Sequence, residues 1–519
     1  MKKHYVIVTG GVLSGVGKGI LSASIARLMK ESGVRVNTLK IDPYLNIDAG
    51  TMNPNQHGEV FVTEDGYEAD LDLGHYERFL GVDMRRHNNL TAGQIYKSVI
   101  DKEREGKYLG STVQIVPHVT DEIKQRISDL DGELIIIEIG GTVGDIEGEV
   151  FLEAVREMTL ENDKENFLFV HVTYAPHLEV TDEFKTKPTQ QSVQLLRRIG
   201  IQPDMIVVRS QFPVEEQDIE KIALFGGVAR SMVFNFPDIE NVYEAPAILH
   251  SYGVHHKIAS RLNMKTDGQF NWEYPRTFAS KKVALIGKYL GTGDSYKSII
   301  ESVVLCGNDK PEILDSQSLE GLSPKELDLI LRKYEALIIP GGFGKRGIEG
   351  KLAAIRYARE NNVPILGICL GMQLMIIEFA RNVQNLTQAD STEFRFKTPY
   401  PVVDIMEDQK KLLMMGGTMR LGAQKAKIFR ETNLFSIYET DEIWERHRHR
   451  FEVNRELASP FLCYPGQNCS GKLTVCAEED FIEAIELQEH SFFIGVQFHP
   501  EFRSKVGLPH PLFKALLDA

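Results

Sequence analysis

Cys369 is the residue of this chain whose surroundings best suit covalent chemistry. It lies in Gly-Ile-Cys-Leu-Gly at 367–371, between an apolar run at 363–368 and an expected helix at 370–379. This is the cysteine counterpart of the Gly-x-Ser-x-Gly turn, whose glycines allow a strained bend that exposes the nucleophile. The helix N-terminus behind the sulfur favours the reactive thiolate. We predict a nucleophilic Cys369, and we interpret the other cysteines as structural: Cys306, Cys463, Cys469 and Cys476.

A cysteine nucleophile needs a base, a group that orients the base, and hydrogen-bond donors for the oxyanion. The C-terminal segment Phe-His-Pro-Glu at 498–501 offers the first two. His499 can take the thiol proton, and Glu501 can fix the tautomer of the imidazole. The loop Pro-Gly-Gly-Phe-Gly at 340–344 can supply one backbone N–H group, and Leu370 can supply another. Taken alone, His499 could equally be a buried core histidine.

A second chemistry is indicated near the N-terminus. An apolar run at 5–9 leads into a glycine-rich loop at 10–19, and an amphipathic helix is expected at 20–32. The glycines and the helix N-terminus direct backbone N–H groups at a phosphate, and Lys18 can contact the β- and γ-phosphates. The usual spacing is altered, because five residues separate Gly11 from Gly17 and Gly19 replaces the hydroxyl residue that normally holds magnesium. An ordinary glycine-rich turn is the weaker alternative.

Since that hydroxyl is missing, the magnesium ligands must lie elsewhere. Asp72 follows an expected turn, and Glu138 stands near the end of the apolar run 134–139, where a carboxylate needs a cation. A solvated Asp72 and a salt-bridged Glu138 are the alternatives. Four lysines near expected strand ends could hold a second phosphate group, although such lysines are usually solvated: Lys40, Lys185, Lys187 and Lys221.

The elements that would position these residues follow an α/β rhythm. Continuous apolar runs, typical of parallel strands buried on both faces, alternate with amphipathic helices. Strands are expected at 5–9, 34–39, 134–139, 167–172, 205–209, 282–286, 336–339 and 363–368, with further helices at 294–306 and 348–359. The region 430–472 has no clear assignment. We predict an α/β chain of two doubly wound parallel-sheet domains, 1–265 and 281–519, joined by a polar linker at 266–280.

Composition limits the function classes. The 519 residues carry 59 Lys and Arg and 73 Asp and Glu, a net charge of −14, which argues against binding nucleic acid or an anionic membrane surface. No apolar run reaches about eighteen residues, and the N-terminal run is a strand rather than a signal peptide. The 5 cysteines are too few for a disulfide framework and lack zinc-site spacing. We expect a cytoplasmic protein.

These motifs resemble those of known families. The second part of the chain is similar to class I (triad-type) glutamine amidotransferases in three segments: 340–344, 367–373 and 498–501. The first part resembles the synthase domain of CTP synthases in four segments: 10–19, 40–44, 139–147 and 185–190. The resemblance covers nearly the whole chain, and it implies a P-loop-like synthase domain followed by an amidotransferase domain.

The resemblance also implies a role for each matching residue. Nucleotide would be bound, with Lys18 on ATP, by Ser14, Gly15, Val16, Gly17, Lys18, Gly19, Ile20, Lys40 and Asp72. UTP, or CTP as product inhibitor, would be bound by Asp145, Ile146, Glu147, Lys185, Thr186, Lys187, Pro188, Thr189, Gln190 and Lys221. The ATP base would lie along Pro237, Asp238 and Ile239. Mg2+ would bind Asp72 and Glu138. Glutamine would be held by Gly342, Leu370, Gly371, Met372, Gln373, Glu393 and Arg450.

The reaction implied by the resemblance is the ATP-dependent amination of UTP to CTP. ATP would phosphorylate O4 of UTP, and Cys369 would release ammonia from glutamine through a thioester. The ammonia would pass through a tunnel near His57 and Val60. The family also implies activation by GTP, with a responsive lid at 343–347, feedback inhibition by CTP, and a homotetramer that can form filaments.

Two alternatives to this reaction stay open. Another ATP-dependent glutamine amide ligase, such as a cobyrinic acid amide synthetase, would combine the same two modules, but the Lys-Thr-Lys-Pro-Thr-Gln segment at 185–190 argues against it. A non-catalytic, filament-forming homologue would be expected to have damaged motifs, whereas Lys18, Cys369, His499 and Glu501 are all present. A partition-type ATPase acting on DNA conflicts with the net charge and with the second domain.

Overall fold

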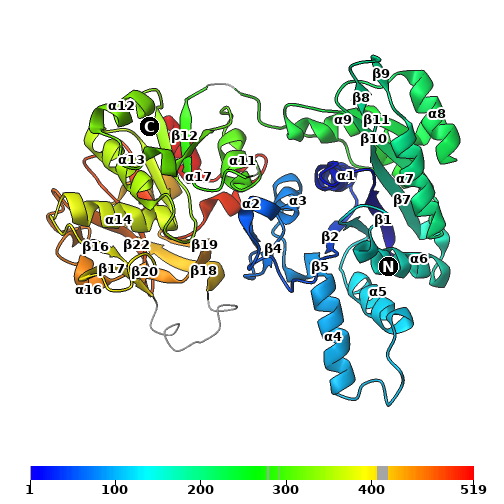
Figure 1. Cartoon of the computed structure of the whole chain (residues 1–519), viewed down its shortest axis with the longest axis horizontal. Helices are drawn as coiled ribbons and strands as arrows, with labels where there is room; N and C mark the ends of the chain where they lie inside the picture. The colour runs from blue at the N-terminus through cyan, green and yellow to red at the C-terminus, as the bar shows by residue number, and fades with distance from the viewer. Residues whose placement is uncertain (1, 278–279, 292, 406–418) are drawn as a thin grey trace. The chain divides into compact units, whose positions relative to one another are not determined.

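The computed structural model describes residues 2–277, 280–291, 293–405 and 419–519, which form two compact units. The first unit comprises Met1–Ala49 and Asp72–Tyr274, and the second comprises Gly50–Leu71 and Pro275–Ala519. Figure 1 colours the chain from blue at the N-terminus to red at the C-terminus and labels its elements. The segment 50–71 therefore interrupts the first unit in sequence while packing with the second.

The first unit is built on a seven-stranded parallel sheet with the strand order β11-β10-β7-β1-β6-β2-β5. Its strands are β1 (His4–Gly10), β2 (Val36–Asp42), β5 (Asn89–Thr91), β6 (Leu134–Ile139), β7 (Phe167–Tyr174), β10 (Met205–Ser210) and β11 (Val233–Pro237). The apolar runs of β1 and β6 are buried along their whole length, as expected for strands covered on both faces. Because β1 lies between β6 and β7, the sheet is wound in both directions, and the predicted α/β class is confirmed.

Helices connect these parallel strands. They are α1 (Lys18–Glu31), α3 (Asp72–Leu80), α4 (Ala92–Arg104), α5 (Thr120–Ser128), α6 (Glu149–Glu161), α7 (Lys187–Arg198), α8 (Glu216–Gly226), α9 (Ala245–Ser251) and α10 (Val254–Arg261). Helix α7 packs on β7 and against α8, as Figure 1 shows. A short hairpin of β8 (His177–Leu178) and β9 (Glu183–Phe184) precedes α7. The loops at the carboxyl ends of β1, β2 and β6 thereby share one edge of the sheet.

The second unit contains a larger, mixed sheet. Its parallel half has the order β13-β12-β14-β15-β24, formed by β12 (Val283–Gly287), β13 (Glu312–Asp315), β14 (Ala336–Ile339), β15 (Ile365–Ile368) and β24 (Phe493–Val496). The sheet continues beyond β24 with antiparallel strands: β23 (Ile482–Glu486), β22 (Leu473–Glu478), β18 (Arg420–Ile428) and β19 (Glu442–His449). The sequence predicted β12, β14 and β15 of the parallel half but missed β13, and the antiparallel half lies in and around the unassigned region 430–472.

Further elements of this unit surround the sheet. Its helices are α2 (Pro54–His57), α11 (Lys297–Leu305), α12 (Pro324–Leu331), α13 (Ile348–Asn361), α14 (Leu370–Asn382), α15 (Asn433–Tyr438), α16 (Arg455–Ala458) and α17 (Pro511–Asp518). Small sheets are formed by β3 (Phe61–Val62) with β4 (Glu68–Ala69) and by β16 (Ala389–Ser391), β17 (Tyr400–Ile405) and β20 (Phe451–Val453). Strand β21 (Leu462–Cys463) pairs with β22.

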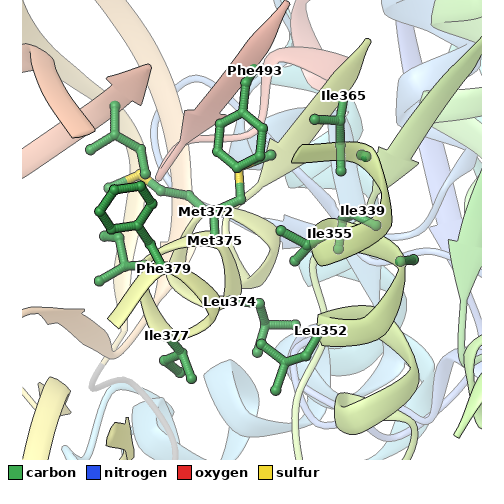
Figure 2. Packing of buried hydrophobic residues seen from close by; sticks show 14 of the residues in the cluster. Ile339, Leu352, Ile355, Ile365, Met372, Leu374, Met375, Ile377, Phe379 and Phe493 are labelled. Carbon is green, nitrogen blue, oxygen red and sulfur yellow. The ribbon is translucent and has the colours of Figure 1, made fainter. Parts of the chain in front are cut away.

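Helix α14 is the best buried helix around the candidate nucleophile. Figure 2 shows Met372, Met375 and Phe379 of this helix packed with Phe493 of β24 and Ile365 of β15. Every residue from Leu370 to Ala380 is buried. Such close packing on several sides fixes the helix N-terminus, and with it Cys369, against the end of β15.

One expectation about the cysteines was wrong. Cys463 and Cys469 form a disulfide, although the sequence favoured buried structural thiols at both positions. The chain after β21 folds back so that the two Cα atoms lie 5.6 Å apart, a separation that suits a disulfide. Cys306, Cys369 and Cys476 are free thiols.

Among the residues that the structure describes, no helix has both the length and the apolar character needed to cross a bilayer.

Candidate active sites

Cys369 occupies a strained turn between β15 and α14. Its φ angle is 53°, in the left-handed region that residues other than glycine rarely adopt. The glycines on either side are required by close packing: a Cβ on Gly371 would lie 2.2 Å from the carbonyl oxygen of Ile339, and one on Gly367 would lie 2.8 Å from the Gly371 carbonyl carbon. The Cys369 N–H donates to the carbonyl of Val496 at 2.7 Å. The turn therefore has the geometry that the motif predicts.

His499 and Glu501 form a hydrogen-bonded pair next to this turn. His499 Nδ1 lies 2.7 Å from Glu501 Oε1, and both side chains are buried. Burial alone would lower the pKa of His499, but the negative charges of Glu501 and Cys369 outweigh it and raise the pKa to about 10. A Cβ on Gly341 would lie 3.8 Å from His499 Nε2 and 3.6 Å from Cys369 Cβ, so both side chains meet beside this glycine. The arrangement suits a thiolate–imidazolium pair.

The glycine loop at 340–344 follows β14 and is held by two buried lysines. Lys351 Nζ donates to the carbonyl of Pro340 at 2.8 Å, and Lys288 Nζ donates to the carbonyls of Phe343 and Gly344 at 2.6 and 2.7 Å. Burial lowers the pKa of Lys288 to about 8 and that of Lys351 well below its ordinary value. Sequence reasoning missed both lysines, because lysine is normally an exposed residue and neither belongs to a motif.

The residues expected to hold glutamine lie on α14 and on loops around the same turn. Leu370, Gly371, Met372 and Gln373 form the first turn of α14, where the Met372 side chain is in the core, so only its backbone is available to a ligand. Glu393 Oε1 accepts the N–H of Gly344 at 2.7 Å. Burial raises the pKa of Glu393. The Gly344 N–H and the charges of Lys288 and Arg450 act in the opposite direction but do not outweigh burial. Glu393 thus lies beside the loop that contains Gly342, and the charge of Arg450 makes a minor contribution to the pKa of Glu393.

A cavity opens at Cys369 within the second unit. Cys369, His499, Gly342 and Phe343 line it, together with Glu59 and Val60 of the segment 50–71. The guanidinium of Arg448 lies 5.2 Å above the ring of Phe343, and that ring is 40% exposed. Val60, the residue at which the resemblance implies a tunnel, therefore lines the same cavity as the candidate nucleophile.

In the first unit, the glycine-rich loop at 10–19 packs closely against Asp72 and Ser192. Gly19 lies in the first turn of α1. A Cβ added to it would be 2.1 Å from Asp72 Oδ1. The Asp72 carboxylate therefore approaches the position where the usual hydroxyl residue would stand. A Cβ on Gly11 would lie 1.5 Å from Ser192 Oγ, so that glycine is also fixed by packing. Lys18 Nζ donates to the carbonyl of Gly141 at 2.8 Å, and burial lowers its pKa.

Three carboxylates gather around Lys40, of which Asp42 and Glu138 are buried and Asp72 is partly buried. Its ammonium pairs with Asp72, and it lies 3.5 Å from both Asp42 Oδ1 and Glu138 Oε1. Burial raises the pKa of Asp72, but the Lys40 charge outweighs this and lowers it. Burial and the Asp72 charge raise the pKa of Glu138, whose carboxylate also accepts from Tyr76. Sequence reasoning missed Asp42, which lies three residues past the expected strand 34–39 and is the last residue of β2 in the structure.

Asp72 and Glu138 offer a donor set that suits magnesium. Mg2+ takes one or two carboxylates and completes its shell with water and phosphate oxygens, and the buried Glu138 and the partly buried Asp72 beside the glycine-rich loop meet that need. Within the described ranges, the one group of three acidic side chains with oxygens mutually within 4.8 Å lies elsewhere, at Asp121, Glu157 and Glu161. There, Lys124 Nζ lies 2.8 Å from both Asp121 and Glu157.

The remaining residues expected to bind nucleotide lie in three segments of the first unit. Asp145, Ile146 and Glu147 form the turn after β6, where Ile146 is 80% exposed. Thr186, Thr189 and Gln190 are buried at the start of α7, while Lys185 pairs with Glu183. Lys221 lies on α8, and its charge makes a minor contribution to the lowered pKa of Glu183.

Pro237 is the last residue of β11, Asp238 and Ile239 follow it, and Arg209 bonds to this segment. The Arg209 guanidinium donates to the Pro237 carbonyl at 2.9 Å and to Asp238 Oδ1 at 2.6 Å. A Cβ on Gly17 would lie 3.4 Å from Arg209 Nε. Arg209 therefore lies close to both the expected base site and Gly17 of the loop, and sequence reasoning missed it, since it looked like an ordinary strand end.

Comparison with known proteins gives consistent matches over the chain. The family model described as CTP synthase N-terminus matches residues 4–264, and that described as glutamine amidotransferase class-I matches residues 292–519. The chain is 67% identical to a CTP synthase of Thermotoga maritima over 98% of both chains. It is 63% identical to a CTP synthase of Thermosipho africanus over 100% of this chain and 99% of the relative. A CTP synthase of Sulfolobus acidocaldarius is 51% identical over 99% of each.

Proposed function

Since the chain belongs to the CTP synthase family, and is therefore an enzyme that converts UTP to CTP with nitrogen from glutamine, we propose that two chemically separate sites share this reaction. Cys369, His499 and Glu501 hydrolyse glutamine in the second unit. The loop at 10–19 and the carboxylates around Lys40 serve the ATP-dependent amination in the first. The observation that carries the proposal is the His499–Glu501 pair beside the strained turn of Cys369.

In glutamine hydrolysis, the Cys369 thiolate attacks the side-chain amide carbon. The N–H groups of Leu370 and of the loop at 340–344 stabilise the oxyanion, and His499 gives its proton to the departing ammonia. A thioester to Cys369 remains, and water activated by His499 hydrolyses it to glutamate. Seven residues position the substrate: Gly342, Leu370, Gly371, Met372, Gln373, Glu393 and Arg450. Their placement around the turn supports this role.

In the amination, ATP phosphorylates O4 of UTP and makes a leaving group at C4, which ammonia then displaces to give CTP. Ser14 and residues 15–20 contact ATP, and Lys18 and Lys40 offset the charge that develops on the phosphates. Asp72 and Glu138 would hold Mg2+, which supplies Lewis-acid neutralisation of phosphate oxygens when bound. Asp145, Ile146 and Glu147, the segment 185–190 and Lys221 bind UTP, and residues 237–239 lie along the ATP base.

Regulation and assembly follow the family expectation. We infer that CTP inhibits by occupying the UTP site, and that GTP activates through the segment 343–347, whose exposed Phe343 next to Arg448 supports a purine contact. Ammonia leaves the Cys369 cavity past Val60. The enzyme is a cytoplasmic homotetramer that can form filaments.

The variant Cys369→Ala tests the division into two sites. We expect it to lose CTP formation from glutamine while keeping CTP formation from ammonium, because the amination needs only free ammonia. Absorbance of CTP in a mixture of UTP, ATP, Mg2+ and either nitrogen source gives the measurement. Loss of both activities in a folded variant would contradict the two-site proposal, and glutamine hydrolysis without Cys369 would contradict the assigned nucleophile.

A further inference from the structure

Gln497 lies directly beside the sulfur of Cys369. Strands β15 and β24 are parallel neighbours, with Ile368 opposite Val496, so the residues that follow them, Cys369 and Gln497, emerge at the same edge of the sheet. Gln497 is completely buried, and its Nε2 lies 3.7 Å from Cys369 Sγ. The established motif of this segment accounts for His499 and Glu501 but leaves Gln497 without a function.

The orientation of the Gln497 amide is fixed by its neighbours. Gln373 Nε2 donates to Gln497 Oε1 at 3.1 Å and to the carbonyl of Phe451 at 2.9 Å. Because the oxygen of the Gln497 amide accepts this bond, its NH2 group must face the sulfur. The backbone N–H of Gln497 donates to the carbonyl of Glu483 at 2.8 Å, which holds the residue in place.

The two polar groups at the sulfur favour different charge states. The carbonyl of Arg448, 3.8 Å from Cys369 Sγ, can accept a bond from a thiol but repels a thiolate. The NH2 group of Gln497 instead donates, and a bond to an ionised acceptor in a buried site is about twice as strong as one to a neutral acceptor. Gln497 therefore stabilises the sulfur when it carries negative charge.

We propose that Gln497 is a catalytic residue of glutamine hydrolysis, which donates an N–H bond to the Cys369 thiolate, and that Gln373 is its positioning residue. The inference rests on the proposed role of Cys369 as nucleophile. The bond stabilises the thiolate before attack. It acts again when water has added to the thioester and the C–S bond breaks, because the electron pair of that bond returns to the sulfur. Both N–H groups of Gln373 are directed inward, to Phe451 and Gln497.

The test compares Gln497→Met with Gln488→Met. Methionine keeps the length of the side chain but removes the donor, and Gln488 is an exposed glutamine of the same unit whose amide donates to the Glu431 carbonyl. Iodoacetamide at pH 7 is the probe, with alkylation of Cys369 followed by mass spectrometry. We expect alkylation of Gln497→Met, and kcat for glutamine hydrolysis, to fall about 10- to 100-fold. KM for glutamine should change little, whereas the thermal midpoint of Gln497→Met should fall modestly, because Gln373 loses the acceptor Gln497 Oε1. Gln488→Met should match the parent.

A purely structural role would lower the thermal midpoint or raise KM and leave the alkylation rate of the folded enzyme unchanged. Alkylation of Gln497→Met at the parental rate would overturn the proposal. If that variant does not fold, Gln497→Glu keeps the shape and places a carboxylate at the sulfur. Its alkylation rate relative to the parent should rise as pH falls from 8 to 6, and a constant ratio would also overturn the proposal. Cys369→Ala separates the two claims, because retained hydrolysis in that variant rejects the nucleophile itself.

Discussion

At the scale of single residues, charge organises the candidate triad. Burial would lower the pKa of His499, but Glu501 and Cys369 raise it to about 10. The imidazolium form is therefore retained through neutral pH, where it favours the thiolate and can later protonate ammonia. Glu501 accepts from His499 at 2.7 Å and so fixes both the charge and the orientation of the ring.

The variant Glu501→Gln should therefore lose most glutamine hydrolysis. Without the carboxylate the pKa of His499 falls, so the proton is lost at a lower pH and the alkaline limb of the activity profile moves down from near pH 10. We expect kcat to fall by about 10²- to 10⁴-fold. A pH profile of glutamate production checks this, with the exposed Glu489→Gln as control. An alkaline limb that stays in place would contradict the charge argument.

Gly19 provides a second test at this scale. The variant Gly19→Ser restores the hydroxyl of the usual phosphate-binding loop, yet its Cβ would lie 2.1 Å from Asp72 Oδ1. We expect Asp72 to be displaced and ammonium-dependent CTP formation to fall by at least about 10-fold, since misplaced catalytic groups are costly. Rates of CTP formation at several Mg2+ concentrations provide the measurement. Unchanged activity would show that Asp72 need not occupy this position.

At the scale of elements, parallel strands bring together residues that are far apart in sequence. The carboxyl ends of β14, β15 and β24 present the loop at 340–344, Cys369 and His499 at one edge. The loop alone needs additional restraint, and Lys351 of α13 provides it by donating to the Pro340 carbonyl. A buried lysine costs desolvation energy, which the lowered pKa of Lys351 reflects.

The variant Lys351→Met should separate stability from activity. Methionine fills the space without a buried charge, while the Pro340 carbonyl loses its donor, and these opposing effects should leave the free energy of unfolding within about 2 kcal/mol of the parent. Glutamine hydrolysis should fall about 10-fold, because the loop that carries an oxyanion donor is less well positioned. Denaturant unfolding and kcat measurements check both expectations. The exposed Lys325→Met is the control. Full activity in Lys351→Met would contradict the proposal that the bond from Lys351 to the Pro340 carbonyl positions the loop.

The sequence predicted those elements that repeated, local patterns encode. The apolar strands β1, β6, β7 and β10 and the turn of Cys369 follow such signals. Strands β5 (Asn89–Thr91) and β11 (Val233–Pro237) were missed, because asparagine and proline are unfavourable in strands. Three features depend on tertiary contacts that no local pattern encodes. They are the burial of Lys288 and Lys351, the bonds of Arg209 to Pro237 and Asp238, and the packing of the segment 50–71 with the second unit.

At the scale of the whole molecule, each compact unit has its own core and its own candidate site. Separate clusters of buried apolar residues lie around the parallel sheets of the first and second units. The net charge of −14 describes the chain as a whole, whereas the sites depend on a few buried cations, among them Lys18 and Lys40. Two self-contained cores predict that damage to one site leaves the fold of the other intact.

The variant Lys18→Ala tests this independence. Lys18 is 8% exposed and points its ammonium to the carbonyl of Gly141, at the loop that would hold the triphosphate. Its removal should lower CTP formation by about 10²- to 10³-fold with either glutamine or ammonium, because both routes need the proposed phosphoryl transfer. Glutamate production should persist, since Cys369 and its partners lie in the second unit. The exposed Lys164→Ala serves as control. If Lys18→Ala lost only the glutamine-dependent activity, the ammonium-dependent reaction would proceed without Lys18. That result would contradict a role of Lys18 in phosphate binding at this loop.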